Sequence, residues 1–335
     1  MTDAATSLTS SVTPIEAGEA VISAAFIETA PILALANGVA LLPATGKRAA
    51  AHADGAILCT ASDGRRMATG GDDGRLVEVD AAGNIKEIAD EGGKWIDAVA
   101  LRSDGAIAWT AGRAARARAA SGETRSLDLP SASRGLAFMH KGYRLAIAHY
   151  NGVSLWFPGA QAKPETLEWK GSHLDVTLSP DGRFLITSMQ ENALHGWRLS
   201  DNKHMRMSGY PAKTRSLSWS PDGKWLATSG ADACILWPFQ GKDGPMGAEP
   251  RECGVRAGVQ ATRVAFHPTA LVIAVGYEDG MVLLCRVTDG SELLVRRPDS
   301  GPDARISALA WDARGARLLF GGENGAAGLL ALPQA

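Results

Sequence analysis

The sequence has few cysteines, and they are far apart. Cys59, Cys234, Cys253 and Cys285 are the four, and no two of them have C-x-x-C spacing. This spacing argues against a disulfide framework and against a structural zinc site. We therefore expect buried, reduced thiols in a cytosolic, and so cytoplasmic, protein.

An excess of basic residues is also missing. Lys and Arg together number 34, Asp and Glu number 36, and the formal net charge is -2. Proteins that bind nucleic acid generally carry a strong basic excess. We expect no nucleic-acid partner, although a local basic patch would remain compatible with this composition.

Long uninterrupted apolar runs are scarce. The longest apolar stretch, Ala20–Ala44, contains Glu28 near its centre, where a membrane span tolerates charge poorly. Two short strands, Val21–Ile27 and Ile32–Ala36, explain the stretch better than a membrane span does. The polar start Met1–Ser10 lacks Lys and Arg, so we expect neither a secretory signal nor a membrane partner.

The chain is rich in turn residues, with 38 Gly and 16 Pro. The turns recur in a repeat. Thr177–Gly182 reads TLSPDG and Ser218–Gly223 reads SWSPDG, about 40 residues apart. Each is followed by an apolar stretch, a small-residue turn and then a tryptophan, Trp197 or Trp237. Weaker copies occupy the rest of the chain.

Eight repeat units account for the whole length. Their apolar or alternating segments are about five to seven residues long, which indicates strands, because helices need ten or more. Four strands in a repeat of about 40 residues are typical of a β-propeller blade. We predict an all-β single domain over residues 1–335, a β-propeller of eight four-stranded blades, with seven blades as the alternative. The units begin near residues 21, 56, 97, 135, 175, 215, 262 and 306.

The last predicted unit lacks its fourth strand, because the chain ends soon after Leu332. An open strand edge at that place would promote aggregation. The N-terminal segment Leu8–Ile15 reads LTSSVTPI and can supply the missing strand. We expect residues 7–15 to close the last blade.

These repeats resemble the WD40 family, in degenerate form, over nearly all of the chain. The resemblance rests on S-P-D-G, on L-A-T-S-G-A-D at Leu226–Asp232, and on a Trp at the end of the third strand. It implies an Asp in the turn between strands two and three. The residues at that position are Asp73, Asp232, Asp279, Asn192 and Asn324.

The resemblance is incomplete. The family's His–Ser–Asp–Trp hydrogen-bonding set is complete in no unit, and the unit with His173, Ser188, Asn192 and Trp197 comes nearest. The one W-D dipeptide, Trp311-Asp312, falls in a first strand instead of a third.

Catalytic and ligand-binding motifs are nearly absent. No G-x-S-x-G, H-E-x-x-H or EF-hand pattern occurs, and the seven histidines show no metal-ligand spacing. Calcium binding by turn acids such as Asp73 and Asp279 is one alternative. We favour instead a role in fixing their own turns by accepting backbone N–H groups. We expect no catalytic residue, metal or cofactor.

Arginines stand at the entries of several first strands. Arg134 and Arg215 are equivalent in the aligned repeats, Arg305 shares their strand parity, and Arg263 should point the other way. Together with Lys213 they would favour an anionic partner on the top face, around the central channel. The alternative is that each pairs with a neighbouring Asp, and the sequence leaves both open.

Trp95 is the aromatic residue most suggestive of binding. It follows Gly92, Gly93 and Lys94 and precedes a first strand, where an exposed Trp would anchor a partner. Burial is equally compatible with the sequence. The Gly- and Pro-rich insertion Phe239–Pro250 is expected to be a surface loop.

The family resemblance implies a non-enzymatic scaffold that binds a partner protein or peptide, and we expect a monomer. The alternative is a metal-dependent propeller hydrolase or lyase. That reading needs convergent Glu, Asp, Asn or His at the inner strand ends, where the sequence has mostly Arg, Ser and small residues.

Overall fold

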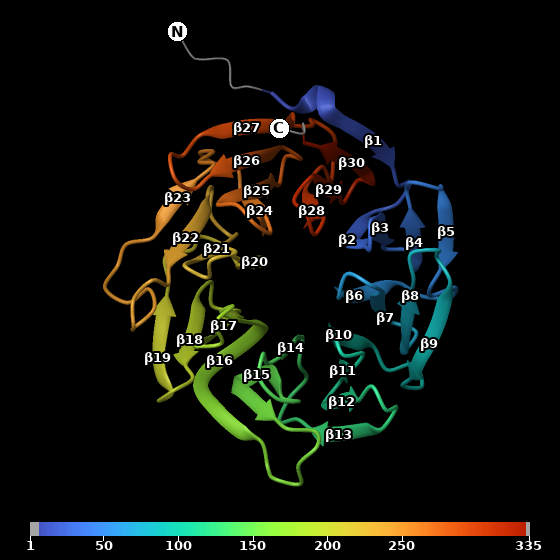
Figure 1. Ribbon diagram of the computed structural model, residues 1–335, viewed down its shortest axis with the longest axis vertical. Helices are drawn as coiled ribbons and strands as arrows, with labels where there is room; N and C mark the ends of the chain where they lie inside the picture. Colours follow the sequence, from blue (N-terminus) through green and yellow to red (C-terminus); the bar gives the residue numbers. More distant parts are fainter. Residues whose placement is uncertain (1–6, 333–335) are drawn as a thin grey trace. The chain divides into compact units, whose positions relative to one another are not determined.

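The computed structural model describes residues 7–332, so the predicted domain over 1–335 extends outside the described residues at both ends. Apart from one short 3-10 helix, η1 (Thr9–Ser11), its regular elements are strands (Figure 1). The strands before residue 160 are β1 (Val12–Glu16), β2 (Val21–Ile27), β3 (Ala30–Leu35), β4 (Val39–Leu42), β5 (Lys47–Ala50), β6 (Ile57–Ser62), β7 (Met67–Gly71), β8 (Arg75–Val79), β9 (Ile85–Asp90), β10 (Ile96–Leu101), β11 (Ile107–Ala111), β12 (Ala114–Arg118), β13 (Thr124–Asp128), β14 (Gly135–Phe138) and β15 (Leu145–Trp156).

The remaining strands have the same short lengths, except for β16. They are β16 (Glu165–Leu178), β17 (Phe184–Met189), β18 (Leu194–Arg198), β19 (Lys203–Met207), β20 (Leu217–Trp219), β21 (Trp225–Thr228), β22 (Cys234–Pro238), β23 (Arg251–Cys253), β24 (Ala261–Phe266), β25 (Val272–Tyr277), β26 (Val282–Arg286), β27 (Glu292–Arg296), β28 (Ile306–Trp311), β29 (Arg317–Gly322) and β30 (Ala326–Ala331).

The strands form antiparallel sheets, in sequence order except where β1 joins β28 to β30, and the fold is the predicted all-β β-propeller. The prediction of eight four-stranded blades is wrong. Hydrogen bonding joins the described strands into seven sheets, so counting each sheet as one blade gives seven. Six sheets have four strands, in the orders β2-β3-β4-β5, β6-β7-β8-β9, β10-β11-β12-β13, β20-β21-β22-β23, β24-β25-β26-β27 and β1-β30-β29-β28, and the seventh runs from β14 to β19.

Two of the predicted sequence repeats share the seventh sheet, because two strands of that sheet bend without ending. β15 is 12 residues long and β16 is 14 residues long. Asn151 and Gly171 occupy the bends with positive φ angles of 67° and 123°. The Gly171 N–H donates to Asn151 Oδ1 at 3.1 Å, so the two bends support each other.

The N-terminal segment provides a strand at the expected place. β1 pairs antiparallel with β30 from Val12 opposite Leu330 to Glu16 opposite Ala326. The predicted segment began earlier, at residue 7, and Thr9–Ser11 form η1 and not part of a strand. At Leu8 the N–H donates to the carbonyl of Leu294 at 2.7 Å.

The described chain consists of two compact units. Unit 1 comprises residues 7–35, 43–45 and 210–332, and contains the sheets of β20–β23, β24–β27 and β28–β30 with β1, together with β2 and β3. Unit 2 comprises residues 36–42 and 46–209, and contains the sheets of β6–β9, β10–β13 and β14–β19, together with β4 and β5.

The S-P-D-G motifs form the turns that their chemistry predicts. Asp181 Oδ1 accepts the Ser179 hydroxyl at 2.6 Å, and Ser179 Oγ accepts the N–H of Phe184 at 2.9 Å. Gly182 closes the turn with a φ of 71°. Ser220 and its neighbours repeat this network in the next copy. Side-chain acceptors therefore satisfy the backbone between the first two strands of these repeats.

Adjacent sheets within a unit pack at very short range. A Cβ added to Gly70 on β7 would lie 2.4 Å from Cγ2 of Ile96 on β10. Ile96 is fully buried, in a cluster with Leu76, Ile107 and Trp109. A glycine at this site is required by close approach rather than by its backbone conformation.

The apolar stretch Ala20–Ala44 contains strands β2, β3 and β4, as the strand interpretation predicted. Among the described residues, no helix is both long enough and apolar enough to cross a membrane.

Candidate functional site

The predicted arginine set is divided between the two units. Arg134 belongs to unit 2, whereas Arg215, Arg263 and Arg305 belong to unit 1 together with Lys213. Arg134 and Arg215 are exposed, and no hydrogen bond or ion pair of either guanidinium is found within residues 7–332. Arg215 uses only its backbone N–H, which donates to Ser229 Oγ at 3.2 Å.

Arg263 and Arg305 are both engaged within unit 1. The Arg263 Nε–H donates to the carbonyl of Ser307 on β28 at 2.6 Å, so its guanidinium ties β24 to the next sheet. Arg305 Nη2 lies 3.7 Å from Glu278 Oε2. Arg305 also lines an acidic cavity of about 440 Å³, whose carboxylates are Glu278, Asp279, Asp299, Asp303 and Glu323. Because carboxylates surround Arg305, its guanidinium attracts an anion less strongly than an unpaired arginine would.

Three of the predicted turn residues accept a backbone N–H two residues further along. Asp73 Oδ1 accepts the Arg75 N–H at 2.9 Å, and Asp279 and Asn324 do the same for Met281 and Ala326 at 3.1 Å.

The other two turn residues differ. Asn192 lies in the turn between β17 and β18 with a φ of 51°. Asp232 has an exposed side chain, and its carbonyl accepts the Arg256 N–H at 2.7 Å. Within residues 7–332, no group of three or more His, Cys, Asp or Glu side chains is arranged to hold a metal ion.

Trp95 is exposed. Its side chain has a relative exposure of 61%, the highest of the large hydrophobic residues in the described chain. It lies between β9 and β10, and the connection between β13 and β14 contains Arg134. Because β10 to β13 form one antiparallel sheet of four strands, the start of β10 and the end of β13 lie at the same end of its strands.

Arg134 lies close enough to β10 to influence the pKa of Asp97 on that strand. Burial raises the pKa of Asp97 on β10, while the Gly112 N–H and the Arg134 guanidinium oppose that rise. Arg134 is thus near the strand that follows Trp95. Its charge remains available to solvent and to a partner.

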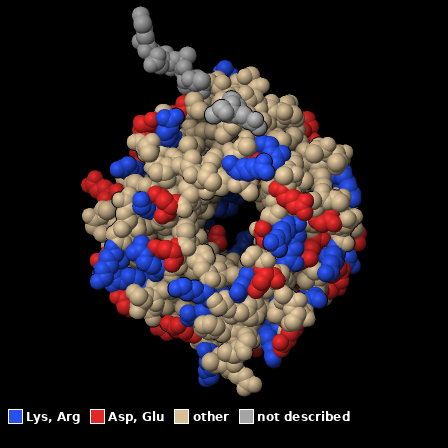
Figure 2. All heavy atoms as spheres, in the orientation of Figure 1, with Lys and Arg blue, Asp and Glu red and all other residues tan. Residues whose placement is uncertain are grey.

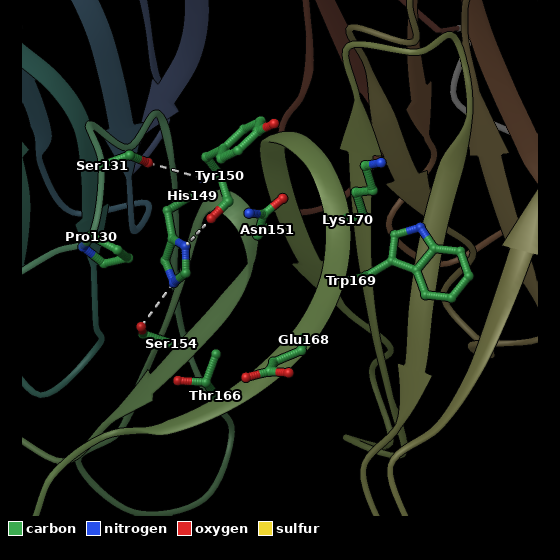
Figure 3. Close-up of a pocket in the computed structure, with 10 residues that line it drawn as sticks. All are labelled: Pro130, Ser131, His149, Tyr150, Asn151, Ser154, Thr166, Glu168, Trp169 and Lys170. Atoms are coloured by element: carbon green, nitrogen blue, oxygen red, sulfur yellow. Dashed lines mark hydrogen bonds between the residues drawn. The ribbon is translucent and has the colours of Figure 1, made fainter.

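A cavity of about 980 Å³ opens in unit 2 beside the bends of β15 and β16 (Figure 3). The residues lining it come from the β13–β14 connection and from the two bent strands. They are Pro130, Ser131, His149, Tyr150, Asn151, Ser154, Thr166, Glu168, Trp169 and Lys170. Ser131 and Arg134 share one short connection, so the cavity adjoins the Arg134 region.

Hydrogen bonds fix the inner wall of the cavity. His149 Nε2 lies 2.9 Å from Ser154 Oγ, and Nδ1 lies 2.9 Å from the carbonyl of Tyr150 (Figure 3). Burial lowers the pKa of His149, so its ring is neutral near pH 7. The Tyr150 N–H donates to Ser131 Oγ at 2.9 Å. The backbone of the wall is therefore held in place around a neutral imidazole.

The outer part of the cavity offers varied side chains to a ligand. The Tyr150 side chain is 54% exposed. Glu168 and Lys170 are also exposed, with opposite charges, on either side of the half-buried Trp169. We call Trp95, Arg134, Tyr150 and Lys170 the loop edge of unit 2. It combines two exposed aromatic rings with two cations.

Comparisons with known proteins agree with this architecture. A family model described as "WD domain, G-beta repeat" matches residues 203–237, and one described as "Anaphase-promoting complex subunit 4 WD40 domain" matches residues 264–334. WD repeat-containing protein 1-B of Xenopus laevis is 33% identical over 82 residues. The chain is a WD40-repeat β-propeller. The aligned part is 24% of this chain and only 14% of the frog protein's length.

The crystal structure of the computationally designed Ika8 protein has the same fold, with a TM-score of 0.73. The two chains are 15% identical, and the alignment covers 94% of this chain and 96% of the other. This likeness concerns the fold alone. WD40 propellers in general bind proteins and are not enzymes, and this sets the class of function to consider for the chain.

The WD40 hydrogen-bonding set survives here in altered forms. In the sequence repeat that contains His173 and Trp197, His173 Nδ1 lies 2.7 Å from Thr187 Oγ1. The partner of His173 is therefore Thr187 and not Ser188. His52 makes a fuller version: Nδ1 lies 3.0 Å from Asp73 Oδ1, and Nε2 lies 2.9 Å from Thr69 Oγ1.

In another repeat, Tyr210 provides the hydrogen bond to a threonine that His52 and His173 provide in theirs. Its hydroxyl lies 2.6 Å from Thr228 Oγ1 and accepts the Trp237 indole N–H at 2.6 Å. Neither this role of Tyr210 nor the cavity was predicted from the sequence. The sequence Tyr150-Asn151-Gly152, an aromatic residue before an Asn-Gly turn pair, was the available signal for the cavity.

Proposed function

We propose that this WD40 protein is a non-enzymatic scaffold that binds a partner protein through the loop edge of unit 2. The observation that carries the proposal is the exposure of Trp95, whose side chain is 61% accessible at the end of a connecting loop. Tryptophan is enriched among residues that dominate binding energy, and leaving so large a ring in water is otherwise unfavourable. Loops on a rigid strand framework are the usual location of binding residues.

Tyr150 provides a second aromatic contact next to a preformed cavity of about 980 Å³. An exposed Tyr supplies apolar area and a hydroxyl at little conformational cost. The hydrogen bonds of His149 and Ser131 fix the backbone around it, so a partner would bind a wall that is already ordered. Preorganisation of this kind reduces the free-energy cost of association.

Charge favours a partner segment with carboxylate or phosphate groups. Arg134 and Lys170 contribute two cations to the loop edge, and Arg134 has no ion-pair partner among the described residues. Figure 2 shows Lys and Arg interspersed with Asp and Glu over the visible face, so the attraction is local and not a property of the whole surface. In unit 1, the exposed Arg215 and the half-buried Lys213 suit the same chemistry, whereas Arg263 and Arg305 are already engaged.

The proposal is tested with two substitutions on the loop edge, Trp95→Ala and Arg134→Glu. Both side chains are exposed, so the variants should unfold at the same temperature as the wild type. We expect proteins that are captured specifically by the wild type to be lost with the double variant.

Arg125→Glu and Ile85→Ala are matched controls on the outer strands β13 and β9. Both side chains are exposed, at 60% for Arg125 and 43% for Ile85. The controls should capture the same proteins as the wild type. Equal capture by the wild type, the double variant and the controls would refute the proposed site.

A further inference from the structure

Three of the four cysteines meet in one buried cluster of unit 1. Cys234 lies on β22, Cys253 on β23 and Cys285 on β26, so two adjacent sheets contribute to the cluster. The sulfur of Cys253 lies within hydrogen-bonding reach of the sulfurs of both Cys234 and Cys285. All three are free thiols. The cluster is not one of the arrangements that could hold a metal ion among the described residues.

The strand register places Cys234 and Cys253 directly opposite each other. Residues opposed in an antiparallel pair have Cα atoms about 4.5 to 5.5 Å apart. Disulfides bridge Cα separations of about 4.4 to 6.8 Å. This pair can therefore be bridged without a change of register. Cys285 belongs to the neighbouring sheet and has no such backbone alignment with Cys253.

Strand β23 is well suited to admit a small oxidant. It has only three residues, Arg251–Cys253, and it is the outer strand of its sheet. The long loop that includes Phe239–Pro250 precedes it, and Gly254 follows with a φ of 64°. Short edge strands open locally at low free-energy cost. Cys253 is 7% exposed, whereas Cys234 and Cys285 are fully buried, so local opening reaches Cys253 first.

The neighbouring thiols also favour the reactive form of Cys253. The S–H groups of Cys234 and then Cys285 donate to its sulfur and lower its pKa, although burial opposes them. The thiolate is the form of cysteine that attacks peroxides. The hydroxyl of Tyr277 is occupied, because it donates to the carbonyl of Gly254.

We propose that Cys253 is a thiol-oxidation site that forms a reversible disulfide with Cys234 when it meets a hydroperoxide. The Cys253 thiolate attacks one oxygen of hydrogen peroxide and becomes a sulfenic acid, and hydroxide leaves. The Cys234 sulfur then attacks the sulfenic sulfur, the S–S bond forms and water leaves. Two thiols lose two electrons and two protons in total, and the peroxide becomes two molecules of water.

The disulfide fastens the edge strand β23 to β22 and closes the loop between them. It therefore orders the insertion Phe239–Pro250, whose Met246 side chain is 49% exposed. Cys285 is the remaining thiol beside the bridge. This inference is independent of the partner-binding proposal, which concerns unit 2.

Peptide mapping of the full chain tests the proposal directly. The folded protein is treated with hydrogen peroxide, alkylated, and digested with trypsin without reductant. Cleavage after Lys and Arg places Cys59, Cys234, Cys253 and Cys285 on separate peptides, residues 49–65, 225–242, 252–256 and 264–286. We expect peptide 252–256 linked to peptide 225–242, two hydrogens lighter than their sum, and released by dithiothreitol.

Variants separate the roles of the thiols. Cys285→Ala and the control Cys59→Ala should keep the link, whereas Cys253→Ala should lose it and leave Cys234 fully alkylated. Two results from the wild type alone would overturn the proposal. One is complete alkylation of Cys234 and Cys253 at a peroxide dose that oxidises Cys59. The other is a link from peptide 252–256 to 264–286 only.

Discussion

His195 should make the protein sensitive to mild acid. It lies on β18 with no exposed surface, and neither ring nitrogen has a hydrogen-bonding partner. Its ring stacks on Trp169, with centroids 3.9 Å apart and planes at 15°. Burial lowers the pKa of His195 to about 3, and the charges of His173, His204 and Arg206 act in the same direction.

The direction in which stability changes with pH follows from proton binding to the folded and unfolded chains. The unfolded chain takes up a proton at His195 near pH 6.5, whereas the folded protein does not until about pH 3. Stability is therefore complete above pH 6.5 and falls between those two values. The loss is about 1.4 kcal/mol per pH unit, or about 2 kcal/mol at pH 5 for His195. Burial also lowers the pKa values of His149 and His173, which add to the loss.

Urea unfolding followed by tryptophan fluorescence at pH 7.5, 6.5, 5.5 and 5.0 measures this effect. The substitution His195→Phe keeps an aromatic ring beside Trp169 and removes the titration. Its loss of stability between pH 7.5 and 5 should be smaller than that of the wild type by about 2 kcal/mol. His140→Phe, at an exposed histidine in the turn after β14, serves as the control. The reasoning is refuted if the wild type and His195→Phe lose the same free energy over this range.

Three other perturbations have definite outcomes. Gly70→Ala forces a methyl group against Ile96 and should cost about 1 to 3 kcal/mol in urea unfolding; an unchanged midpoint would show that the sheets can separate freely. Tyr210→Phe removes the acceptor of the Trp237 indole N–H and should cost about 1 to 3 kcal/mol, and an unchanged thermal unfolding temperature would argue against that network. Deletion of residues 1–16 leaves the edge of β30 unpaired, so size-exclusion chromatography should show aggregates that the full chain lacks; a monodisperse deletion variant would contradict this role of β1.

Local chemistry made much of the fold predictable. The S-P-D-G turns could be predicted from the sequence because Ser179, Asp181 and Gly182 act on groups within a few residues of themselves. The predicted number of blades was wrong because two residues far apart in the sequence act together. Asn151 and Gly171 bend two strands without ending them, and the bond between these residues joins positions 20 apart in sequence.

The site was less predictable, because the environment of a side chain depends on which sheet lies next to it. The arginines illustrate this. The sequence grouped Arg305 with Arg134 and Arg215 and predicted that Arg263 points the other way, but it did not identify Ser307 as the partner of Arg263 or Glu278 as the partner of Arg305. Trp95 was equally compatible with burial and exposure in the sequence, and only the packing around its loop shows it to be exposed.

The central claim is that Trp95 touches a partner protein. A photoreactive benzoylphenylalanine in place of Trp95, irradiated in extract of the source cell, tests that contact directly. The same amino acid in place of Ile85, exposed on the outer strand β9, is the matched control. The account predicts a discrete crosslinked protein at position 95 that is absent at position 85. Crosslinking of the same proteins at both positions, or of none at position 95, would contradict it.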